Sequence, residues 1–429
     1  MEAADVFTKL DVQLQPDPSR TVIRPFRFGY PEAFAAGRPL RSQMLLKRLA
    51  GLHEGVRERM HAFVEGPMQA RHRNALTTFL RQVDDLAPEL GDISGLSEHD
   101  RLSLGAYFSQ EFAFESAALF NPSIVPLPGE EREAGSSVRF LLSLRGIGEG
   151  HVSSVTFRTG TWDTGTGLTI DPPSPHCMSP QIQSDDAGWV RLQCEDSENV
   201  SETVIFPVLP DQRQGVEDLR MVLFTEEDGR EVLLGTYTAF DGRTAREGLL
   251  RGIDLRTFEM RTLEGAMAGY KGMALFPRRI GGKFVMLGRQ DSENIWLLHS
   301  DDINVWQTGI PIMSPRYPWE FVQIGNCGSP IEIDEGWLVF THGVGMVRGY
   351  CIGACLLDRD DPSKVLRRTR APLIFPSAEQ HGGYVPNVTY SCGALVHRRR
   401  VLLPYGIADQ FTGFAVADLD DVLSAMVPG

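Results

Sequence analysis

The sequence predicts an all-β main domain that follows an α-helical N-terminal segment, with the change near residue 120. From Asn121 onward, short apolar or alternating runs follow one another at short intervals, and no helical pattern separates them. Before Asn121, apolar residues instead recur at spacings of three and four, as they do on one face of a helix. The 43 glycines and 27 prolines supply the tight turns that a chain of many short strands needs.

The N-terminal segment is predicted to form helices over residues 40–86 and from Ser97 through Phe112. We expect a break at Gly66-Pro67, because proline removes a helical hydrogen bond. Ser97 is a good N-cap for the second stretch. Acidic residues interleave with the Arg and Lys residues, which favours a solvated helix surface over a binding face. The apolar stripe comprises Leu45, Leu49, Leu52, Val56, Met60, Phe63, Leu76, Phe79, Leu80, Val83 and Leu86.

The strands predicted after residue 120 exclude a parallel sheet of βαβ units and leave a sandwich, a barrel or a propeller. Roughly 300 residues at about four strands per blade suit a propeller of about five or six blades. Asp228-Gly229 and Gly281-Gly282 lie between strand pairs, where hairpin turns need a positive φ. The predicted strands include 139–145, 152–158, 220–224, 232–238, 284–287, 295–298, 336–340, 351–357, 394–396 and 401–403.

Composition excludes several classes of protein. The 429 residues are 42% hydrophobic and 23% charged, as in an ordinary globular protein. A net charge of −14 argues against a general affinity for nucleic acid or for an anionic membrane surface. The six cysteines include no CxxC pair, so neither a zinc ribbon nor a thioredoxin-like redox site is predicted. No signal-peptide pattern and no run of about 18 apolar residues is visible, so we expect a cytoplasmic protein.

The Gly-rich segment 146–150 resembles the opening of a dinucleotide-binding loop, but a strand follows it where that motif requires a helix. We expect its glycines to let the backbone turn beside a cavity, with Glu149 and His151 at the rim. Zinc protease, NTPase and serine hydrolase functions lack a motif, since HExxH, a Walker loop and GxSxG are absent from the sequence.

Four polar clusters are predicted at strand ends, at residues 215–220, 288–291, 341–344 and 405–409. A solvated turn or a paired strand-end charge would explain any one of them. Together they mix carboxylates with Arg, His and Tyr, which favours a site for a polar and partly anionic ligand. Paired carboxylates suit glycosidic bond cleavage, in which one of them protonates the leaving oxygen. Arg and His suit the capture of an inorganic oxyanion.

The order of several motifs resembles glycoside hydrolase family 130, the inverting β-mannoside phosphorylases and β-1,2-mannosidases. The resemblance covers residues 120–425 and is most specific in the last third. It implies a five-bladed β-propeller catalytic domain at 121–429, preceded by a helical extension at 1–120. Such extensions often build oligomers, which implies a homo-oligomer formed through the N-terminal helices. The motifs are Asn121-Pro-Ser-Ile, VEDLR at 216–220, 237–242, 323–331, Gly336-Trp-Leu, 341–344, 350–358, 361–365, 383–388, Cys392-Gly393 and 405–409.

The resemblance assigns roles residue by residue. Asp218 matches the catalytic acid, although Leu219 stands where the family usually has proline. Arg145 resembles the arginine of the mannosyl subsite, and Asp409 resembles the carboxylate that binds mannosyl hydroxyls. The remaining substrate-binding candidates are His151, Tyr237, Asp291 and Tyr405, and the phosphate-binding candidates are Arg289, His342, Tyr350, Gln323 and, more weakly, Arg278.

Gln323 marks a departure from the family, because many of its phosphorylases have lysine at this point. An amide supplies no charge, and losing one charge-assisted contact costs about 1.5–3 kcal/mol of phosphate binding. Arg289 and His342 are retained, which favours phosphorolysis to α-mannose 1-phosphate, with inorganic phosphate as co-substrate and no cofactor. The alternatives are hydrolysis of the same β-mannosides, with Glu149 as the base that activates water, and a catalytically silent propeller that binds glycans.

Overall fold

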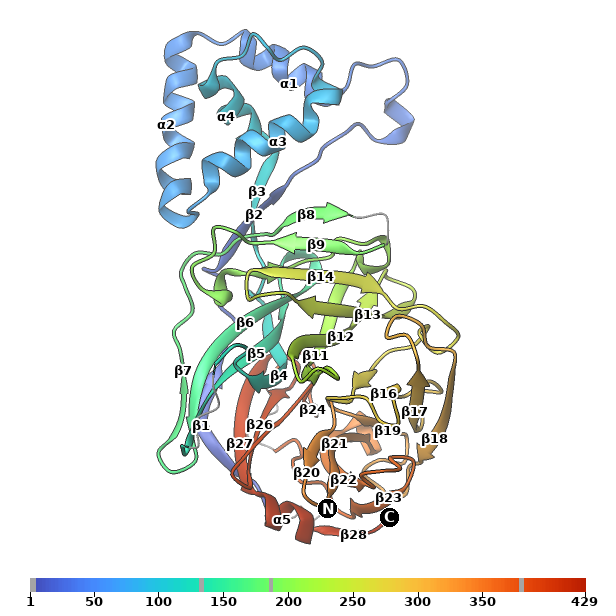
Figure 1. The fold of residues 1–429 in the computed structure, drawn as a ribbon. Helices are drawn as coiled ribbons and strands as arrows, with labels where there is room; N and C mark the ends of the chain where they lie inside the picture. Colours follow the sequence, from blue (N-terminus) through green and yellow to red (C-terminus); the bar gives the residue numbers. More distant parts are fainter. Residues whose placement is uncertain (1–4, 131–134, 185–187, 378–381) are drawn as a thin grey trace. The chain divides into compact units, whose positions relative to one another are not determined.

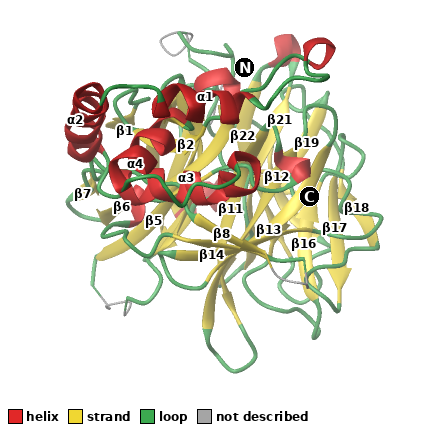
Figure 2. Ribbon diagram, turned by 90° about the horizontal axis from the view of Figure 1, so that it is seen from above, coloured by secondary structure: helices red, strands yellow, loops and turns green. Residues whose placement is uncertain are grey.

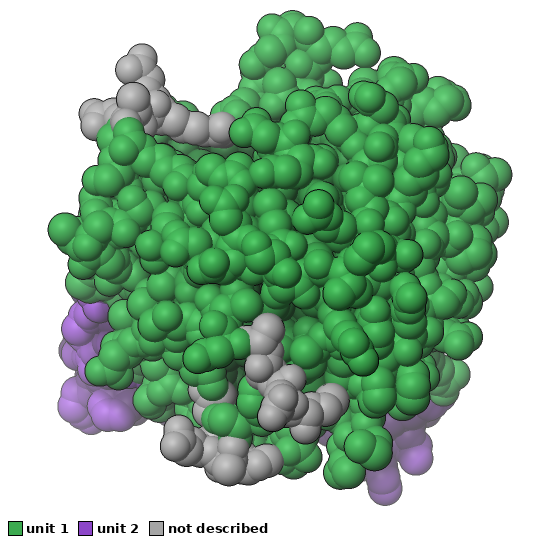
Figure 3. Space-filling view, turned by 90° about the horizontal axis from the view of Figure 1, so that it is seen from below, with its two compact units in different colours: residues 1–18, 114–173, 180–429 green, residues 19–113, 174–179 purple. Residues whose placement is uncertain are grey.

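The computed structural model describes residues 5–130, 135–184, 188–377 and 382–429. It divides into two compact units, which Figure 3 colours separately. The β unit contains residues 1–18, 114–173 and 180–429, and the helical unit contains residues 19–113 and 174–179. The helical unit is therefore an insertion near the start of the β unit, whereas the sequence predicted an N-terminal extension at 1–120. The difference arises because β1 (Thr8–Leu14), the first strand that the structure describes, pairs with β27 (Phe411–Asp418), one of the last.

The helical unit consists of helices and a two-stranded ribbon (Figures 1 and 2). Leu49, Val83 and Leu86 are buried in its core, as the apolar stripe predicts. Ser97 caps the last helix by accepting a hydrogen bond from the Asp100 amide at 3.1 Å. The elements are β2 (Thr21–Pro25), the 3-10 turn η1 (Glu32–Phe34), α1 (Arg41–Ala50), α2 (Glu54–Arg71), α3 (Ala75–Leu90), α4 (Glu98–Tyr107) and β3 (Ser109–Ala113).

Several helix boundaries differ from the prediction. The predicted stretch 40–86 forms three helices, with breaks at 51–53 and 72–74, and the third runs to Leu90. Helix α2 runs through Pro67, so the predicted break is wrong. Val64 and Met68, on either side of this proline, pack into the helical core, and we attribute the continuity to that packing, which must offset the roughly 3 kcal/mol that an interior proline costs. Helix α4 ends at Tyr107, and Phe112 lies in β3, where it pairs with Val22 of β2.

The largest sheet has 11 strands among the described residues, arranged as two antiparallel halves. The halves meet where Gly215 pairs with Ser153. Gly229 has a φ of 82° in the hairpin between β11 and β12, which confirms the predicted turn. The strands are β4 (Ala118–Pro126), β5 (Ser137–Ile147), β6 (Ser153–Asp163), β7 (Gly167–Ile170), β8 (Gln181–Ser184), β9 (Val190–Gln193), β10 (Val204–Ile205), β11 (Gly215–Thr225), β12 (Glu231–Phe240), β13 (Ala245–Gly252) and β14 (Thr257–Thr262).

Three further antiparallel sheets are described in the β unit (Figure 1). One holds β15 (Ala274–Leu275), β16 (Phe284–Gly288), β17 (Ile295–Ser300) and β18 (Thr308–Met313). The next holds β19 (Gln323–Asn326), β20 (Ile331–Ile333), β21 (Gly336–Val344), β22 (Tyr350–Leu357), β23 (Val365–Thr369) and β28 (Met426–Pro428). The last holds β24 (Thr389–Tyr390), β25 (Leu395–His397), β26 (Arg400–Ile407), β27 (Phe411–Asp418) and, from the start of the chain, β1 (Thr8–Leu14).

The core of the β unit lies between neighbouring sheets. Phe276 and Leu287 of the β15–β18 sheet pack against Trp337 of β21, and all three side chains are buried. Short helical segments complete the unit: η2 (Glu149–His151), η3 (Val200–Glu202), η4 (Pro210–Gln212), η5 (Met346–Arg348) and α5 (Leu419–Ser424). Among the residues that the structure describes, no helix is both long enough and apolar enough to span a membrane. The chain is thus mostly β with one helical unit.

Candidate active site

Three polar residues of the β unit share a left-handed backbone. Asn121, Asp218 and Asp409 have φ values of 48°, 50° and 51°. Asp218 lies in a bulge of β11, where the pairing with β12 shifts register between Glu217 and Arg220. A non-glycine residue in this conformation costs about 1–3 kcal/mol and is found preferentially at functional sites. A bulge also re-aims the side chain that it carries.

These three residues lie with Arg145 and Glu217 in what we call the acid cluster: Asn121, Arg145, Glu217, Asp218 and Asp409. Asp218 Oδ1 accepts hydrogen bonds from Asn121 Nδ2 at 2.8 Å and from Arg145 Nη1 at 3.3 Å. Arg145 Nη2 also donates to Glu217 Oε1 at 2.8 Å. The charge of Arg145 acts on Asp409 as well. The Arg145 guanidinium therefore interacts with three carboxylates, those of Glu217, Asp218 and Asp409.

The two aspartates of the acid cluster have very different pKa values. Burial raises the pKa of Asp218, but the charges of Arg145 and Arg220 outweigh burial and lower this pKa to about 2. For Asp409, burial and repulsion from the Asp218 carboxylate together raise the pKa to about 6. Asp218 is thus ionised in the free site near neutral pH, and Asp409 holds its proton in mildly acidic solution.

Arg220 fixes the bulge from behind. Its fully buried guanidinium donates to the main-chain oxygens of Asp218 and Cys327, each at 2.9 Å. Its Nη2 donates to the Tyr390 hydroxyl oxygen at 2.7 Å. The resulting network links the catalytic strand β11 to β24, which lies 170 residues further along the chain.

A second group, the anion cluster, comprises Arg289, His342 and Tyr350. Gln323 lies on β19 two residues before Gly325, which pairs with His342 of β21. Arg289 follows β16 and His342 lies on β21, and their Nη1 and Nε2 atoms are 3.1 Å apart. Burial and then the charge of Arg289 hold the pKa of His342 well below its usual value, so the imidazole is neutral and Nε2 accepts from Arg289. The sequence predicts that His342 donates to an anion, whereas in the free site its Nε2 accepts from Arg289 and orients the arginine.

Aromatic rings and glycines enclose the anion cluster. The His342 ring stacks on Tyr350, with centroids 6.1 Å apart, and lies 4.9 Å from the Tyr390 ring. A Cβ at Gly325 would lie 2.4 Å from the His342 ring, so only glycine allows this approach. Because Tyr390 also accepts from Arg220, it connects the two clusters.

The structure brings some predicted residues together and separates others. Arg278 forms an ion pair with Glu332 at 2.7 Å and lies over the Trp337 ring, so its partners are outside both clusters. Asp291 accepts from the amides of Glu293 and Asn294 in a turn, which is a structural role.

The remaining candidates lie in the core or on exposed turns. Tyr237 is fully buried and its hydroxyl accepts from Gln212 at 2.7 Å, and Tyr405 is buried in a core cluster. Glu149 and His151 are exposed in η2, and their predicted place at the rim of a cavity stays a prediction. Within the described residues, no hydrogen bond or ion pair joins Glu149 to Asp218.

Sequence reasoning assigned no role to several residues that the structure places at the site. Glu217 and Arg220 flank Asp218 in the VEDLR motif, so their positions were visible, whereas Tyr390 carried no signal. Lys271 is exposed, and its charge contributes to lowering the pKa of Asp218. Buried Glu247 also lies within electrostatic reach of Arg220 and Arg289.

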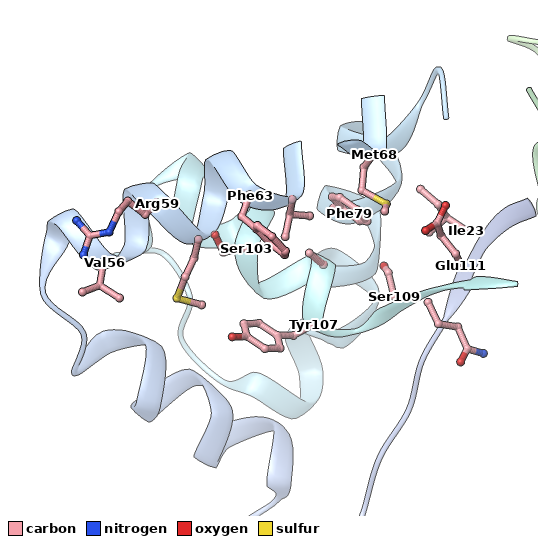
Figure 4. A pocket seen from close by; sticks show the side chains of 14 residues that line it. Ile23, Val56, Arg59, Phe63, Met68, Phe79, Ser103, Tyr107, Ser109 and Glu111 are labelled. Atoms are coloured by element: carbon pink, nitrogen blue, oxygen red, sulfur yellow. The ribbon is translucent and has the colours of Figure 1, made fainter. Parts of the chain in front are cut away.

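The helical unit has a cavity of its own, of about 580 Å³. Figure 4 shows Phe63 of α2, Phe79 of α3 and Tyr107 of α4 around it. Its lining is mainly apolar, and the carboxylate Glu111 at its edge is bound by Arg71 and His72. The chemistry of this cavity does not match that of a sugar or phosphate site.

A partly buried acid bound by an arginine, on a mostly β fold, suits a carbohydrate-active enzyme, and similarity to known proteins gives the family. A family model described as β-1,4-mannooligosaccharide phosphorylase matches residues 187–427. The chain belongs to this family, glycoside hydrolase family 130.

Two characterised relatives come from Thermoanaerobacter sp. (strain X514). The β-1,2-mannobiose phosphorylase is 35% identical over 230 residues, which is 52% of this chain and 74% of the relative. The 1,2-β-oligomannan phosphorylase is 38% identical over 154 residues, which is 35% of this chain and about half (52%) of the relative.

The fold is also similar to a solved structure. The β-1,2-mannobiose phosphorylase from Listeria innocua superposes with a TM-score of 0.52 at 19% identity. The match covers 73% of this chain and 92% of that structure. The likeness shows a shared fold.

Proposed function

We propose that this protein is an inverting β-mannoside phosphorylase that transfers a terminal mannosyl group to inorganic phosphate and releases α-mannose 1-phosphate. The observation that carries the proposal is the linkage of two clusters of opposite character, through Arg220 and Tyr390, within one network. Asp218 supplies the acid and Arg289 supplies the cation for phosphate. The family membership of the chain supports the same assignment.

In this mechanism Asp218 must be protonated in the complex, although it is ionised in the free site. A phosphate dianion bound nearby raises the pKa of Asp218 by repulsion, and sugar hydroxyls compete for the donors Asn121 and Arg145. The proton then passes to the glycosidic oxygen, in the family through a sugar hydroxyl. Phosphate oxygen bonds to C1 from the opposite face as the C1–oxygen bond breaks, which gives inversion and a neutral sugar alcohol.

The anion cluster favours phosphate over water as the nucleophile. Arg289 is buried and uses one nitrogen to donate a hydrogen bond to His342, so its other donors are available to an oxyanion. Gln323, at the start of β19, adds no charge, and we propose that exposed Lys271 compensates in part. An inverting hydrolase needs a second carboxylate about 6.5–9.5 Å from the acid. Glu149, the sequence candidate for that role, lies on an exposed turn.

For the fold, we propose a five-bladed β-propeller. The largest sheet supplies two antiparallel groups, β4–β7 and β11–β14, and the other sheets that the structure describes supply three more. Strand β1 completes the last group by pairing with β27, so both ends of the unit contribute to one blade.

The test compares β-1,2- and β-1,4-mannobiose, with and without millimolar phosphate. Both linkages are tested because the relatives' activities include both. We expect mannose 1-phosphate to appear only with phosphate. Release of free mannose at the same rate without phosphate would make the enzyme a hydrolase, and Glu149 would be the first carboxylate to substitute. Inertness toward a broad panel of β-mannosides would favour the glycan-binding alternative.

We also propose that the protein forms a homo-oligomer through the helical unit. Phe63 on α2 is 80% exposed at the edge of the cavity in Figure 4, and Phe34 is also exposed. Apolar side chains left open in this way mark association surfaces. Light scattering should show an oligomer for the full chain and smaller species for Phe63→Ser. A monomeric wild type would overturn this proposal.

A further inference from the structure

Glu247 is a buried carboxyl group that the proposed mechanism does not use. It lies on β13, pairs through its backbone with Thr238 of β12, and has no exposed surface. Within the part of the chain that is described, no side chain donates a hydrogen bond to its oxygens. The amides of Gly272 and Met273 face it instead.

The groups around Glu247 come from several strands. Arg220 faces it from β11, Tyr237 from β12 and Arg289 from the end of β16. Arg220 makes its hydrogen bonds to neutral oxygens, and its positive charge acts on both Asp218 and Glu247. Glu247 thus interacts electrostatically with both the arginine that holds the acid strand and the arginine of the anion cluster.

Gly272 connects Glu247 to the anion cluster mechanically. Its φ is 89°, and a Cβ there would lie 2.7 Å from Arg289 Nε, so the 271–273 segment packs directly on the guanidinium. Asn326 Nδ2 donates to the Gly272 oxygen at 3.0 Å and holds this segment against β19. The Glu247 amide donates to the Ala268 oxygen at 3.1 Å, so β13 is attached to the stretch of chain that leads to Lys271 and to the segment that supports Arg289.

The charge state of Glu247 decides how much of the positive charge of Arg289 a ligand meets. Burial raises the pKa of Glu247 to about 8, although the charges of Arg220 and Arg289 oppose this rise. The group is therefore neutral at neutral pH. Gln323 stands where many relatives have a lysine, so the site has less positive charge for phosphate. A neutral Glu247 does not offset the positive charge that Arg289 still provides.

We propose, on the basis of the proposed phosphorolysis, that Glu247 is a positioning residue of the phosphate site. In its neutral form it leaves the charge of Arg289 to a phosphate dianion, and in its ionised form it withdraws that charge. Linkage makes the effect reciprocal, so a bound dianion also keeps the proton on Glu247.

The first experiment measures KM for phosphate between pH 6.5 and 9.5 in wild type and in Glu247→Gln, which is isosteric and stays neutral. We expect KM of wild type to rise about fivefold more than KM of the variant between pH 7 and pH 9, since a bound dianion that raises the pKa of Glu247 by about one unit gives this change in affinity by pH 9. The variant corrects for the ionisation of phosphate itself. Parallel profiles would overturn the proposal.

A second experiment needs only wild type, in case Glu247→Gln does not fold. Sulfate, a dianion that does not titrate in this range, is bound to the protein at pH 8 in two buffers of different ionisation enthalpy. Calorimetry should show net proton uptake on binding, and uptake should be lost in Glu247→Gln where that variant is folded. Binding without proton uptake, or no sulfate binding, would overturn the inference.

The two proposals fail in different ways. Absence of mannose 1-phosphate at every pH would refute the proposed phosphorolysis, while proton-linked sulfate binding would still support the role of Glu247. Phosphate-dependent product formation with parallel KM profiles would leave the phosphorolysis standing and remove the role of Glu247.

Discussion

The acid cluster and the anion cluster manage charge in opposite ways. In the acid cluster, the carboxylates of Glu217 and Asp218 are already bound by Arg145, and the pKa of Asp218 falls to about 2. In the anion cluster, Arg289 faces a neutral His342, and its charge is left for a ligand. We therefore expect substitutions in the acid cluster to affect the chemical step, and substitutions in the anion cluster to affect KM for phosphate.

Asp218→Asn should have the largest effect, a fall of about 10³-fold in kcat, because an amide cannot donate the required proton. Asparagine accepts the left-handed backbone at this position, so the fold should persist. The measurement is mannose 1-phosphate formation from β-mannobiose, with thermal unfolding as the check on folding. Asp228→Asn, in an exposed hairpin turn, is the matched control. A loss below tenfold would remove Asp218 from the acid role.

Arg289→Ala should raise KM for phosphate about 30-fold, since a charge-assisted contact contributes about 1.5–3 kcal/mol. Initial rates at varied phosphate measure the change. Arg278→Ala should leave KM within about twofold, because Arg278 pairs with Glu332 outside both clusters. If the two variants exchanged these results, the assignment drawn from the structure would be wrong.

Gln323→Lys should lower KM for phosphate about fivefold by adding the missing charge at the start of β19. Gln323→Glu at the same position should raise KM, so the pair tests the sign of the effect. Equal KM values for both variants would show that Gln323 does not face the phosphate.

Asp409→Asn should give the smallest effect, a gain of about 1 kcal/mol in the free energy of unfolding at pH 7.5. The folded state holds the Asp409 proton up to about pH 6, while the unfolded state loses it near pH 4. The favourable contribution is therefore complete below pH 4 and lost as the pH rises through 6. The expected gain in the free energy of unfolding is smaller than the pKa shift alone would give, because Asp409 is only half-buried and solvent screens its charge.

Urea unfolding at pH 4 and pH 7.5 measures the change at Asp409. Asp291→Asn should act with the opposite sign at pH 7.5, since hydrogen bonds from the Asn294 side chain and amide outweigh burial and lower its pKa to about 2. Stabilisation by both variants would contradict this account.

Local patterns predicted what local forces determine. The alternating and apolar runs identified the strands, the glycines at 229, 281 and 282 have the expected positive φ, and VEDLR located the acid. Pairing across long sequence separations was not predictable. Tyr390 meets Arg220 across 170 residues, and nothing near either residue indicates the other. Arg278 and Arg289 look alike in sequence, but Arg278 pairs with Glu332 and Arg289 with His342, and both partners lie on other strands.

The pairing of β1 with β27 makes the helical unit a cassette inside the β unit. The chain leaves and returns at neighbouring points, since the Asp17 amide donates to the Glu115 oxygen at 3.1 Å and β2 pairs with β3 just beyond. Long insertions at such points cost little loop-closure entropy. Deleting residues 1–120 would strip β1 from its sheet and expose the edge of β27. Excising 19–113 with a short linker would keep that edge paired, and it would remove contacts such as that of His176 with the Arg71 oxygen.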